Sequence, residues 1–297
     1  MNGIVNIYKE KGFTSHDVVN IVRGLTKCKA GHTGTLDPDA EGVLPVCLGR
    51  ATKIADYIMA DDKEYIADVI LGTSTDTQDA SGETLTNKPF LGDLSSIHNG
   101  IQGFVGRIQQ IPPMYSAIKI GGKKLYEYAR QGAVVERKPR QVTINDIEVL
   151  EADLPTSFKV RVSCSKGTYI RTLCADIGEK LGSAAHMGDL LRTKSGSFHI
   201  KNAIKLADFR EIIARGEIDR VLIPIEDALS DFPKIIISDK AEKWLVNGNK
   251  IPLDFACSEA ELLSNAEYLA YDEAGNLAGI FVLSSDAKYV KPKVMFL

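Results

Sequence analysis

The sequence contains no apolar run of about 18 residues, which excludes a helix that crosses a membrane. Its start, "MNGIVNIYKEKG", lacks the basic segment followed by an apolar segment that marks a secretory signal. The five cysteines are odd in number, widely spaced and without a CxxC pair, so they indicate neither a disulfide framework nor a structural zinc site. We therefore expect a cytoplasmic protein without a bound metal.

Charge of one sign is scarce in two segments, although the chain as a whole is nearly neutral. The 297 residues are 44% hydrophobic and 25% charged, and the net charge of −3 alone argues against a nucleic-acid partner. Residues 107–140, however, hold eight basic residues against two acids, whereas residues 61–83 hold seven acids against one lysine. Such segregation is typical of a protein with an anion-binding face. The alternative, a solvated basic hairpin without a ligand, remains open at this point.

The hydrophobic pattern alternates between helices and strands up to about residue 223. It predicts a helix that begins at Ser15 as N-cap, a buried central strand over 63–72 and a half-exposed strand over 158–165. After a turn at Gly167 it predicts another helix, whose apolar stripe runs from Ile170 to Leu181. The segment after residue 223 is typical of a linker. From residue 234 onward, short strands are separated by turn motifs, which predicts a second, mostly β domain.

The segment "GHTGTLDPDAEGVLP" at residues 31–45 places an acid in a glycine-rich turn. The proline that follows Asp37 favours an extended backbone there, and the glycines allow a ligand to approach closely. Asp37 is therefore a candidate nucleophile or base, with a helix N-cap as the structural alternative and Asp39 and Glu41 as rival acids. A phosphatase of the haloacid-dehalogenase type is excluded, because its aspartate follows an apolar strand and precedes the threonines.

Five motifs then occur in the order typical of one family. They are "KGFTSHDVVNIVRGLTKCKAGHTGTLDPDAEGVLPVCLGRATK", "KEYIADVILGTSTDT", "QIPPMYSAIKIGGKKLYEYARQG", "CSKGTYIRTLCADIG" and "AHMGDLLRTKSG". Together they cover roughly residues 3–200, and they closely resemble the bacterial tRNA pseudouridine-55 synthases, the TruB family. Glu10, where many members have proline, and Gln78, where an acid is frequent, depart from the family pattern.

This resemblance implies an isomerase that converts uridine to pseudouridine at position 55, in the TΨC loop of tRNA, by base flipping. No cofactor and no metal are expected. Asp37 matches the essential aspartate of the family, which acts at the sugar or at the base. Arg171 matches the arginine that pairs with this aspartate, and a surface charge on an amphipathic helix is its structural alternative.

Four further residues match substrate-binding positions of the family. Tyr65 matches the tyrosine that stacks on the target base, and it is a candidate for the later proton transfer. Tyr169 lies in the same motif as Arg171, and Leu190 matches an apolar residue on the floor of the site. His32 matches the histidine that holds the rearranged RNA loop after the base has left the stack.

The resemblance also implies the domain organisation and the RNA contacts. We expect an α+β fold: a pseudouridine-synthase-like catalytic domain at 1–233 with a central, mainly antiparallel sheet flanked by helices, and a small β-rich, PUA-like domain at 234–297. An inserted segment at about 104–141 is expected to clamp the RNA through four cations, Lys119, Lys123, Lys124 and Arg130.

The expected partner is the T-arm and acceptor stem of tRNA, without a membrane, a guide RNA or an obligate protein partner, and the expected state is a monomer. The C-terminal segment is acidic, however, with six lysines against nine acids from Ile235 onward. A different function also remains open, that of a tRNA-binding folding helper whose main role is to remodel RNA rather than to catalyse.

Overall fold

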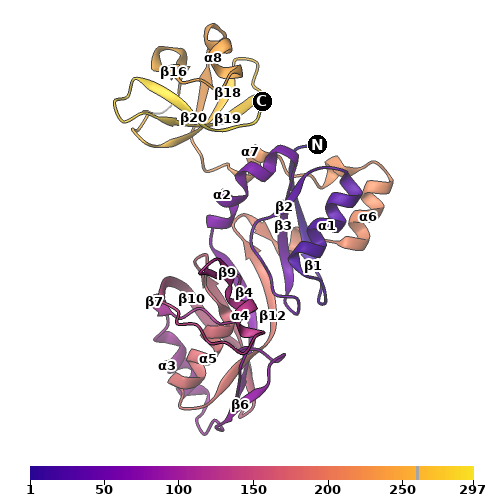
Figure 1. Cartoon of the computed structure of the whole chain (residues 1–297), viewed down its shortest axis with the longest axis vertical. Helices are drawn as coiled ribbons and strands as arrows, with labels where there is room; N and C mark the ends of the chain where they lie inside the picture. The colour runs from indigo at the N-terminus through magenta and orange to yellow at the C-terminus, as the bar shows by residue number, and fades with distance from the viewer. Residues whose placement is uncertain (259–260) are drawn as a thin grey trace.

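The computed structural model describes residues 1–258 and 261–297, and its largest element is a long twisted sheet (Figure 1). The strands lie in the order β14-β1-β3-β12-β4-β11-β10-β7, with β2 paired to β3 and β13 to β12. Two pairs, β1 with β14 and β3 with β12, are parallel, and the others are antiparallel. The bounds are β1 (Gly3–Lys9), β2 (Ala30–His32), β3 (Glu41–Leu48), β4 (Lys63–Leu71), β7 (Gly106–Gln110), β10 (Arg140–Asp153), β11 (Ser157–Cys164), β12 (Ala185–Ser195), β13 (Phe198–His199) and β14 (Ile204–Lys205).

Helices cover this sheet in two groups, and each group encloses its own hydrophobic core. The helices α1 (Ser15–Thr26) and α6 (Leu206–Ala214) pack beside β1 and β3, whereas α3 (Leu94–Gln102) and α5 (Ile170–Lys180) pack on the half that contains β4, β11 and β10. The strand β12 joins the two halves, because it pairs with β3 on one side and with β4 on the other. A 3-10 helix (Gly49–Ile54) and α2 (Ala55–Ala60) connect β3 to β4.

Two local expectations are corrected. The helix α1 is capped by Thr14 rather than Ser15: the Thr14 side chain accepts from the Asp17 N–H, and Asp17 accepts in return. The strand β4 is central, as predicted, but only alternate side chains are fully buried, so it is not covered equally on both faces.

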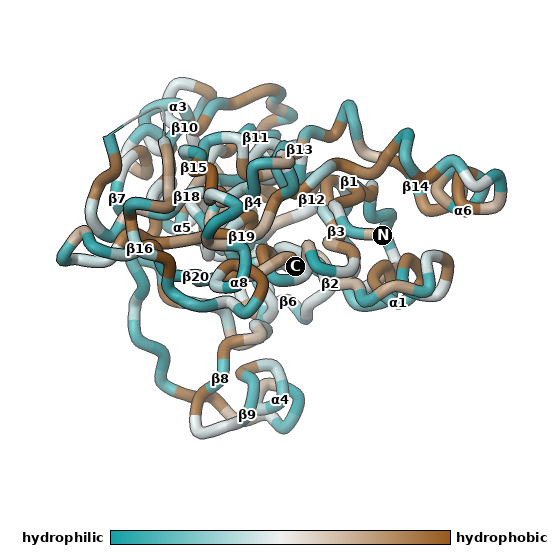
Figure 2. Tube along the Cα trace, turned by 90° about the horizontal axis from the view of Figure 1, so that it is seen from above, coloured by the Kyte–Doolittle hydropathy of each residue, from teal (hydrophilic) through white to brown (hydrophobic). Residues whose placement is uncertain are grey.

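The segment at about 104–141, which the sequence indicated as an insertion, begins and ends in strands of the main sheet. Its first part forms β7, which pairs with β10. Between these strands, β8 (Lys119–Ile120), β9 (Lys123–Lys124) and α4 (Leu125–Ala129) form a small unit that projects from the body (Figure 2). A second hairpin, β5 (Thr73–Thr75) with β6 (Thr84–Asn87), follows β4. The projecting part is therefore shorter than residues 104–141.

A separate six-stranded sheet forms the C-terminal end of the molecule (Figure 1). Its order is β16 (Ile251–Pro252), β20 (Tyr289–Met295), β19 (Leu277–Leu283), β18 (Glu267–Asp272), β15 (Lys234–Ile237) and β17 (Ala256–Cys257), and it carries α8 (Glu242–Val246). The linker contains α7 (Ile225–Ala228). Leu269, Ile280 and Phe296 join a buried cluster with residues of β1 and β3, and Lys53 donates to the Met295 carbonyl at 2.7 Å. The two sheets are thus packed together.

The expected α+β architecture is confirmed: a central, mainly antiparallel sheet with flanking helices is followed by a β-rich C-terminal sheet. In the part of the chain that the structure describes, no helix has the length and apolar character needed to cross a membrane.

Candidate active site

Asp37 lies in the turn between β2 and β3, at the boundary between the two halves of the main sheet. A strand rather than a helix follows this turn, so the interpretation of Asp37 as a helix cap is wrong. Gly42 and Pro45, which interrupt a helical pattern, are both accommodated within β3. The Asp37 side chain is 41% exposed, which leaves its carboxylate accessible from solvent.

Contacts from the first 15 residues hold this turn in place. The ammonium of Lys9, a fully buried residue, donates to the carbonyl oxygens of Pro38 at 3.0 Å and Ala40 at 2.5 Å. The hydroxyl of Ser15 donates to the Leu36 carbonyl at 3.1 Å and accepts from the Leu36 N–H at 2.8 Å. Backbone groups on both sides of Asp37 are therefore fixed, and the carboxylate is presented by a rigid loop.

Arg171 is the central partner of the carboxylate. It lies in the first turn of α5 and is 6% exposed, so the alternative of a surface charge is wrong. Its Nε lies 3.1 Å from Asp37 Oδ2, and its Nη2 lies 3.3 Å from Asp37 Oδ1. This two-point contact is the geometry in which a guanidinium both holds and orients a carboxylate.

The remaining donors of Arg171 are also used. Nη1 contacts Asp79 Oδ2 and the Thr77 carbonyl, each at 3.3 Å, and Nη2 donates to the Tyr115 carbonyl at 2.9 Å. Every nitrogen of the guanidinium therefore has a partner, which offsets the cost of burying its charge. Of the three acids in this segment, Asp37 is the one for which the described structure shows contacts with Arg171.

Burial and the neighbouring charges act in opposite directions on Asp37. Desolvation raises the pKa of its carboxyl above the usual range, and the Arg171 guanidinium lowers it. Asp79 adds to the rise because it is a second negative charge nearby. Arg171 is therefore the main group that favours the ionised carboxylate in this site.

Tyr65 and Tyr169 lie near enough to Asp37 for electrostatic interaction, and Leu190 belongs to the same hydrophobic cluster as the neighbouring Leu36. Tyr65 on β4 and Leu190 on β12 contribute to one hydrophobic cluster, which also contains Leu36. Tyr169 occupies the N-cap position of α5 without a side-chain capping bond. Its backbone N–H donates to Gln110 Oε1 at 2.8 Å, and its carbonyl accepts from Gln110 Nε2 at 3.0 Å. Burial raises the pKa of both tyrosines, which therefore stay neutral at physiological pH.

His32 lies on β2, opposite Val46 of β3, at the start of the turn that carries Asp37. Its Nδ1 accepts from the Gly34 N–H at 3.3 Å, which leaves Nε2 as the donor of a neutral ring. Burial lowers the pKa of His32, so the neutral form is favoured. The ring can stack on a base and donate one hydrogen bond without adding a charge.

The four predicted clamp cations lie in the projecting unit. The Lys123 ammonium lies 5.9 Å from the centre of the Tyr128 ring, whereas Lys124 and Arg130 each lie 5.4 Å from the centre of the Tyr126 ring. Lys119 is exposed on β8. The segment that leads into this unit contacts the ion pair, because Arg171 Nη2 donates to the Tyr115 carbonyl.

Asp79, Gln110, Lys9 and Ser15 are the contributors to the site that sequence reasoning missed. Asp79 lies in an acidic turn segment, and because such turns are usually solvated, no local signal distinguished it. Gln110 is 2% exposed and Lys9 fully buried. Polar residues inside otherwise apolar runs are a signal that could have indicated Lys9, because such residues are rarely buried without a partner.

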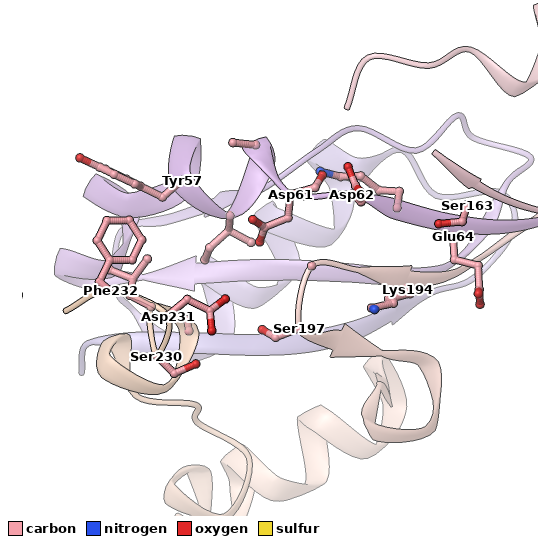
Figure 3. A pocket seen from close by; sticks show the side chains of 16 residues that line it. Tyr57, Asp61, Asp62, Glu64, Ser163, Lys194, Ser197, Ser230, Asp231 and Phe232 are labelled. Atoms are coloured by element: carbon pink, nitrogen blue, oxygen red, sulfur yellow. The ribbon is translucent and has the colours of Figure 1, made fainter. Parts of the chain in front are cut away.

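A cavity of about 740 Å³ lies elsewhere, between α2, the start of β4, the end of β12 and the linker (Figure 3). Four acids, Asp61, Asp62, Glu64 and Asp231, contribute to its lining, together with Lys63 and Lys194. This lining disfavours a polyanion such as RNA. Asp37, Arg171 and Tyr65 are not among the residues that line the cavity, so it is distinct from the Asp37 site. Within residues 1–258 and 261–297, no group of three or more His, Cys, Asp or Glu side chains is arranged to hold a metal ion.

The fold, with a solvent-accessible aspartate paired to a buried arginine, is consistent with an enzyme of the pseudouridine synthase class, and comparisons with known proteins show that class. The chain matches the family model "TruB family pseudouridylate synthase (N terminal domain)" over residues 22–170 and the model "tRNA pseudouridylate synthase B C-terminal domain" over residues 171–230. It is 46% identical to tRNA pseudouridine synthase B of Bacillus licheniformis over 94% of this chain and 92% of that protein. It is 43% identical to the Bacillus subtilis protein of the same name over 95% and 93%.

Chains in solved structures are also similar to this chain in fold and in sequence. A Cbf5-Nop10-Gar1 complex contains a chain that is 28% identical, with a TM-score of 0.76 and coverage of 99% of this chain and 85% of that chain. An H/ACA RNP bound to a substrate RNA contains one that is 26% identical, with a TM-score of 0.75 and the same coverage. The protein described here belongs to the TruB family of pseudouridylate synthases. The expectation of a pseudouridine synthase is confirmed.

Proposed function

We propose that this chain isomerises uridine to pseudouridine at position 55 in the TΨC loop of tRNA, with Asp37 as the essential carboxylate. The observation that carries the proposal is the Asp37–Arg171 pair, in which an accessible carboxylate is held at two points by a buried guanidinium. The names of the relatives, tRNA pseudouridine synthase B, support tRNA as the substrate.

The chemistry exchanges one bond at C1′ of the ribose. The bond from C1′ to N1 breaks, the uracil turns, and a bond from C1′ to C5 forms, while C5 loses a proton and N1 gains one. A carboxylate that bonds to the sugar or the base, or stabilises positive charge on the sugar, must be ionised. Arg171 favours that form of Asp37 and fixes the direction in which its oxygens point.

The surrounding residues have roles that follow from their chemistry. The ring of Tyr65 stacks on the extruded base and replaces stacking lost from the RNA, while Tyr169 and Leu190, which packs in the same hydrophobic cluster as Tyr65, contact the base from other sides. Because burial keeps the Tyr65 phenol neutral, it can donate its proton to N1, and the phenolate that results can accept the proton that C5 loses. The neutral His32 ring occupies the space in the RNA loop that the base has left.

The RNA is held by two outer parts of the molecule. Lys119, Lys123, Lys124 and Arg130 on the projecting unit bind backbone phosphates, and this contribution weakens as salt is added. The C-terminal domain at 234–297 serves as a PUA-like domain against the acceptor stem, and the catalytic domain spans 1–233. The enzyme works as a cytoplasmic monomer, without a guide RNA or a protein partner.

The proposal is tested with an unmodified tRNA transcript and the purified chain alone. Nucleoside analysis and primer extension after carbodiimide treatment should reveal pseudouridine at position 55, and a matched transcript with cytidine at that position should gain none. Tight binding of the transcript without conversion would refute the enzyme assignment and favour the tRNA-folding helper. Conversion at another uridine would refute the target position.

A further inference from the structure

Arg192 is a buried cation that none of the roles above uses. It lies on β12, the strand between the two halves of the sheet, directly opposite Gly42 of β3 and Tyr65 of β4. It is 1% exposed and is among the largest fully buried side chains of the protein. Its position places a permanent positive charge beneath the site, between the turn of Asp37 and the strand of Tyr65.

The guanidinium joins the turn to the sheet. Its Nε donates to the Val43 carbonyl at 2.7 Å, its Nη2 to the Gly34 carbonyl at 3.1 Å and its Nη1 to the Thr35 carbonyl at 3.5 Å. The last two carbonyls belong to the residues that lead into Leu36 and Asp37. A single planar fork therefore holds the incoming side of the turn, opposite the contacts that Lys9 makes on its outgoing side.

Two glycines of the segment at residues 31–45 lie next to Arg192. Gly42 has a φ of +107°, and a Cβ there would lie 2.2 Å from the carbonyl oxygen of Arg192. Gly34 has a φ of +139°, and a Cβ there would lie 3.6 Å from Arg192 Nη1. Gly42 thus allows β3 to approach the β12 backbone closely, whereas at Gly34 the positive φ, and not a lack of space beside the guanidinium, favours glycine.

Fold stability alone does not account for a charge at this position. The partners of Arg192 are uncharged: it donates to the backbone carbonyls of Val43, Gly34 and Thr35, and it also hydrogen-bonds the Tyr65 side chain. Within the described residues, no carboxylate forms an ion pair with it. A buried charge can often be replaced by an apolar side chain of similar volume with no loss of stability. The position of Arg192 therefore indicates a role at the site.

Its charge reaches the aromatic residues of the site. Burial raises the pKa of Tyr65, and Arg192 is the main group that opposes this rise. Burial also lowers the pKa of His32, and Arg192 adds to that decrease because a second positive charge nearby is unfavourable.

We propose that Arg192 is a positioning residue for the isomerisation. Its guanidinium holds the carbonyl groups of residues 34 and 35, which keeps the Asp37 carboxylate in one position relative to Arg171 and to the strand of Tyr65. This inference rests on the proposed role of Asp37. A small displacement of a reacting group can reduce a rate by about 100-fold, so loosening the turn affects the chemical step more than RNA binding.

The test compares Arg192→Lys and Arg192→Met with Lys63→Met as a matched control. Lys63 is also a buried cation that donates to backbone carbonyls, those of Met59 at 2.7 Å and of Asp61, but it ties α2 to β4 instead of holding the turn. For each purified variant, kcat and KM are measured on the tRNA transcript, and the melting temperature is recorded. The enzyme concentration used to calculate kcat is that of the protein molecules able to bind tRNA.

We expect Arg192→Lys to lower kcat about tenfold or more with KM within about threefold, and Arg192→Met to lower it further. Lys63→Met should lower the melting temperature but leave kcat within about twofold. A kcat within about twofold for Arg192→Lys would overturn the inference. Equal losses in the control, or failure of both Arg192 variants to fold, would also overturn it in favour of a general role in stability.

A parallel assay of Asp37→Asn separates the two proposals. If Asp37→Asn turns over normally, the proposed catalytic role of Asp37 fails, and the positioning role of Arg192 fails with it. If Asp37→Asn is inactive while Arg192→Lys is normal, only the inference about Arg192 fails.

Discussion

Replacing Arg171 by lysine or methionine tests how the ion pair contributes to the rate. A lysine ammonium can keep one contact with Asp37 but cannot reproduce the two-point contact at 3.1 and 3.3 Å. A hydrogen bond to a charged group contributes about 1.5–3 kcal/mol, which corresponds to a roughly 10- to 150-fold change in rate. Because the Asp37 side chain is 41% exposed, water replaces part of the loss, so we expect about a tenfold lower kcat for Arg171→Lys.

Arg171→Met removes the charge as well as the contacts. We expect a loss of about 100-fold or more, because Asp37 and Asp79 then face each other without a cation. The pH dependence should change too. Burial raises the pKa of Asp37 and Arg171 opposes the rise, so without Arg171 the pKa increases further and less carboxylate is ionised at a given pH.

The assay is a single-turnover measurement with enzyme in excess over labelled transcript, repeated across pH. The acid limb of the rate profile should move to higher pH in Arg171→Met and stay near its original position in Arg171→Lys, which keeps a positive charge. The reasoning is refuted if Arg171→Lys retains a rate within about twofold of the wild type, or if both variants have the same acid limb as the wild type.

Three further changes have expected outcomes. Asp79→Asn removes the second carboxylate on Arg171 at 3.3 Å, so kcat should fall about tenfold with tRNA affinity within about twofold, as measured by turnover and filter binding; an unchanged kcat would remove Asp79 from the site. Neutralising Lys123 and Lys124 together should reduce the slope of log affinity against log salt by up to about two, and an unchanged slope would show that they do not contact phosphate. Gly42→Ala should destabilise the fold by about 1–3 kcal/mol in urea unfolding, because its Cβ would overlap the β12 backbone; wild-type stability would contradict that packing.

The sequence was sufficient to predict much of the fold, because hydrophobic periodicity is a local property. The alternating pattern of β11 and the apolar stripe of α5 are both present in the structure. The strand β3 was not predicted, since Gly42 and Pro45 resemble helix breakers and turn residues. They are compatible with a strand here because β12 approaches closely at Gly42, and no local pattern contains that information.

The site could be predicted only in part. The motif around Asp37 and the match of Arg171 identified two residues 134 positions apart, which the structure joins. Asp79, Gln110 and Arg192 could not be found in the same way. Their contributions depend on which backbone groups they meet in the folded state, and those partners come from distant parts of the chain.

The most direct test of the account is the conversion of tRNA by Asp37→Asn, with Asp39→Asn as a matched control from the same turn. Single-turnover formation of pseudouridine and the Kd for the transcript are measured for both variants and for the wild type. For Asp37→Asn we predict no detectable pseudouridine and a Kd within about tenfold of the wild type, equivalent to about 1.4 kcal/mol of binding free energy. For Asp39→Asn we predict normal conversion. Wild-type conversion by Asp37→Asn would contradict the central claim that this carboxylate carries the chemistry.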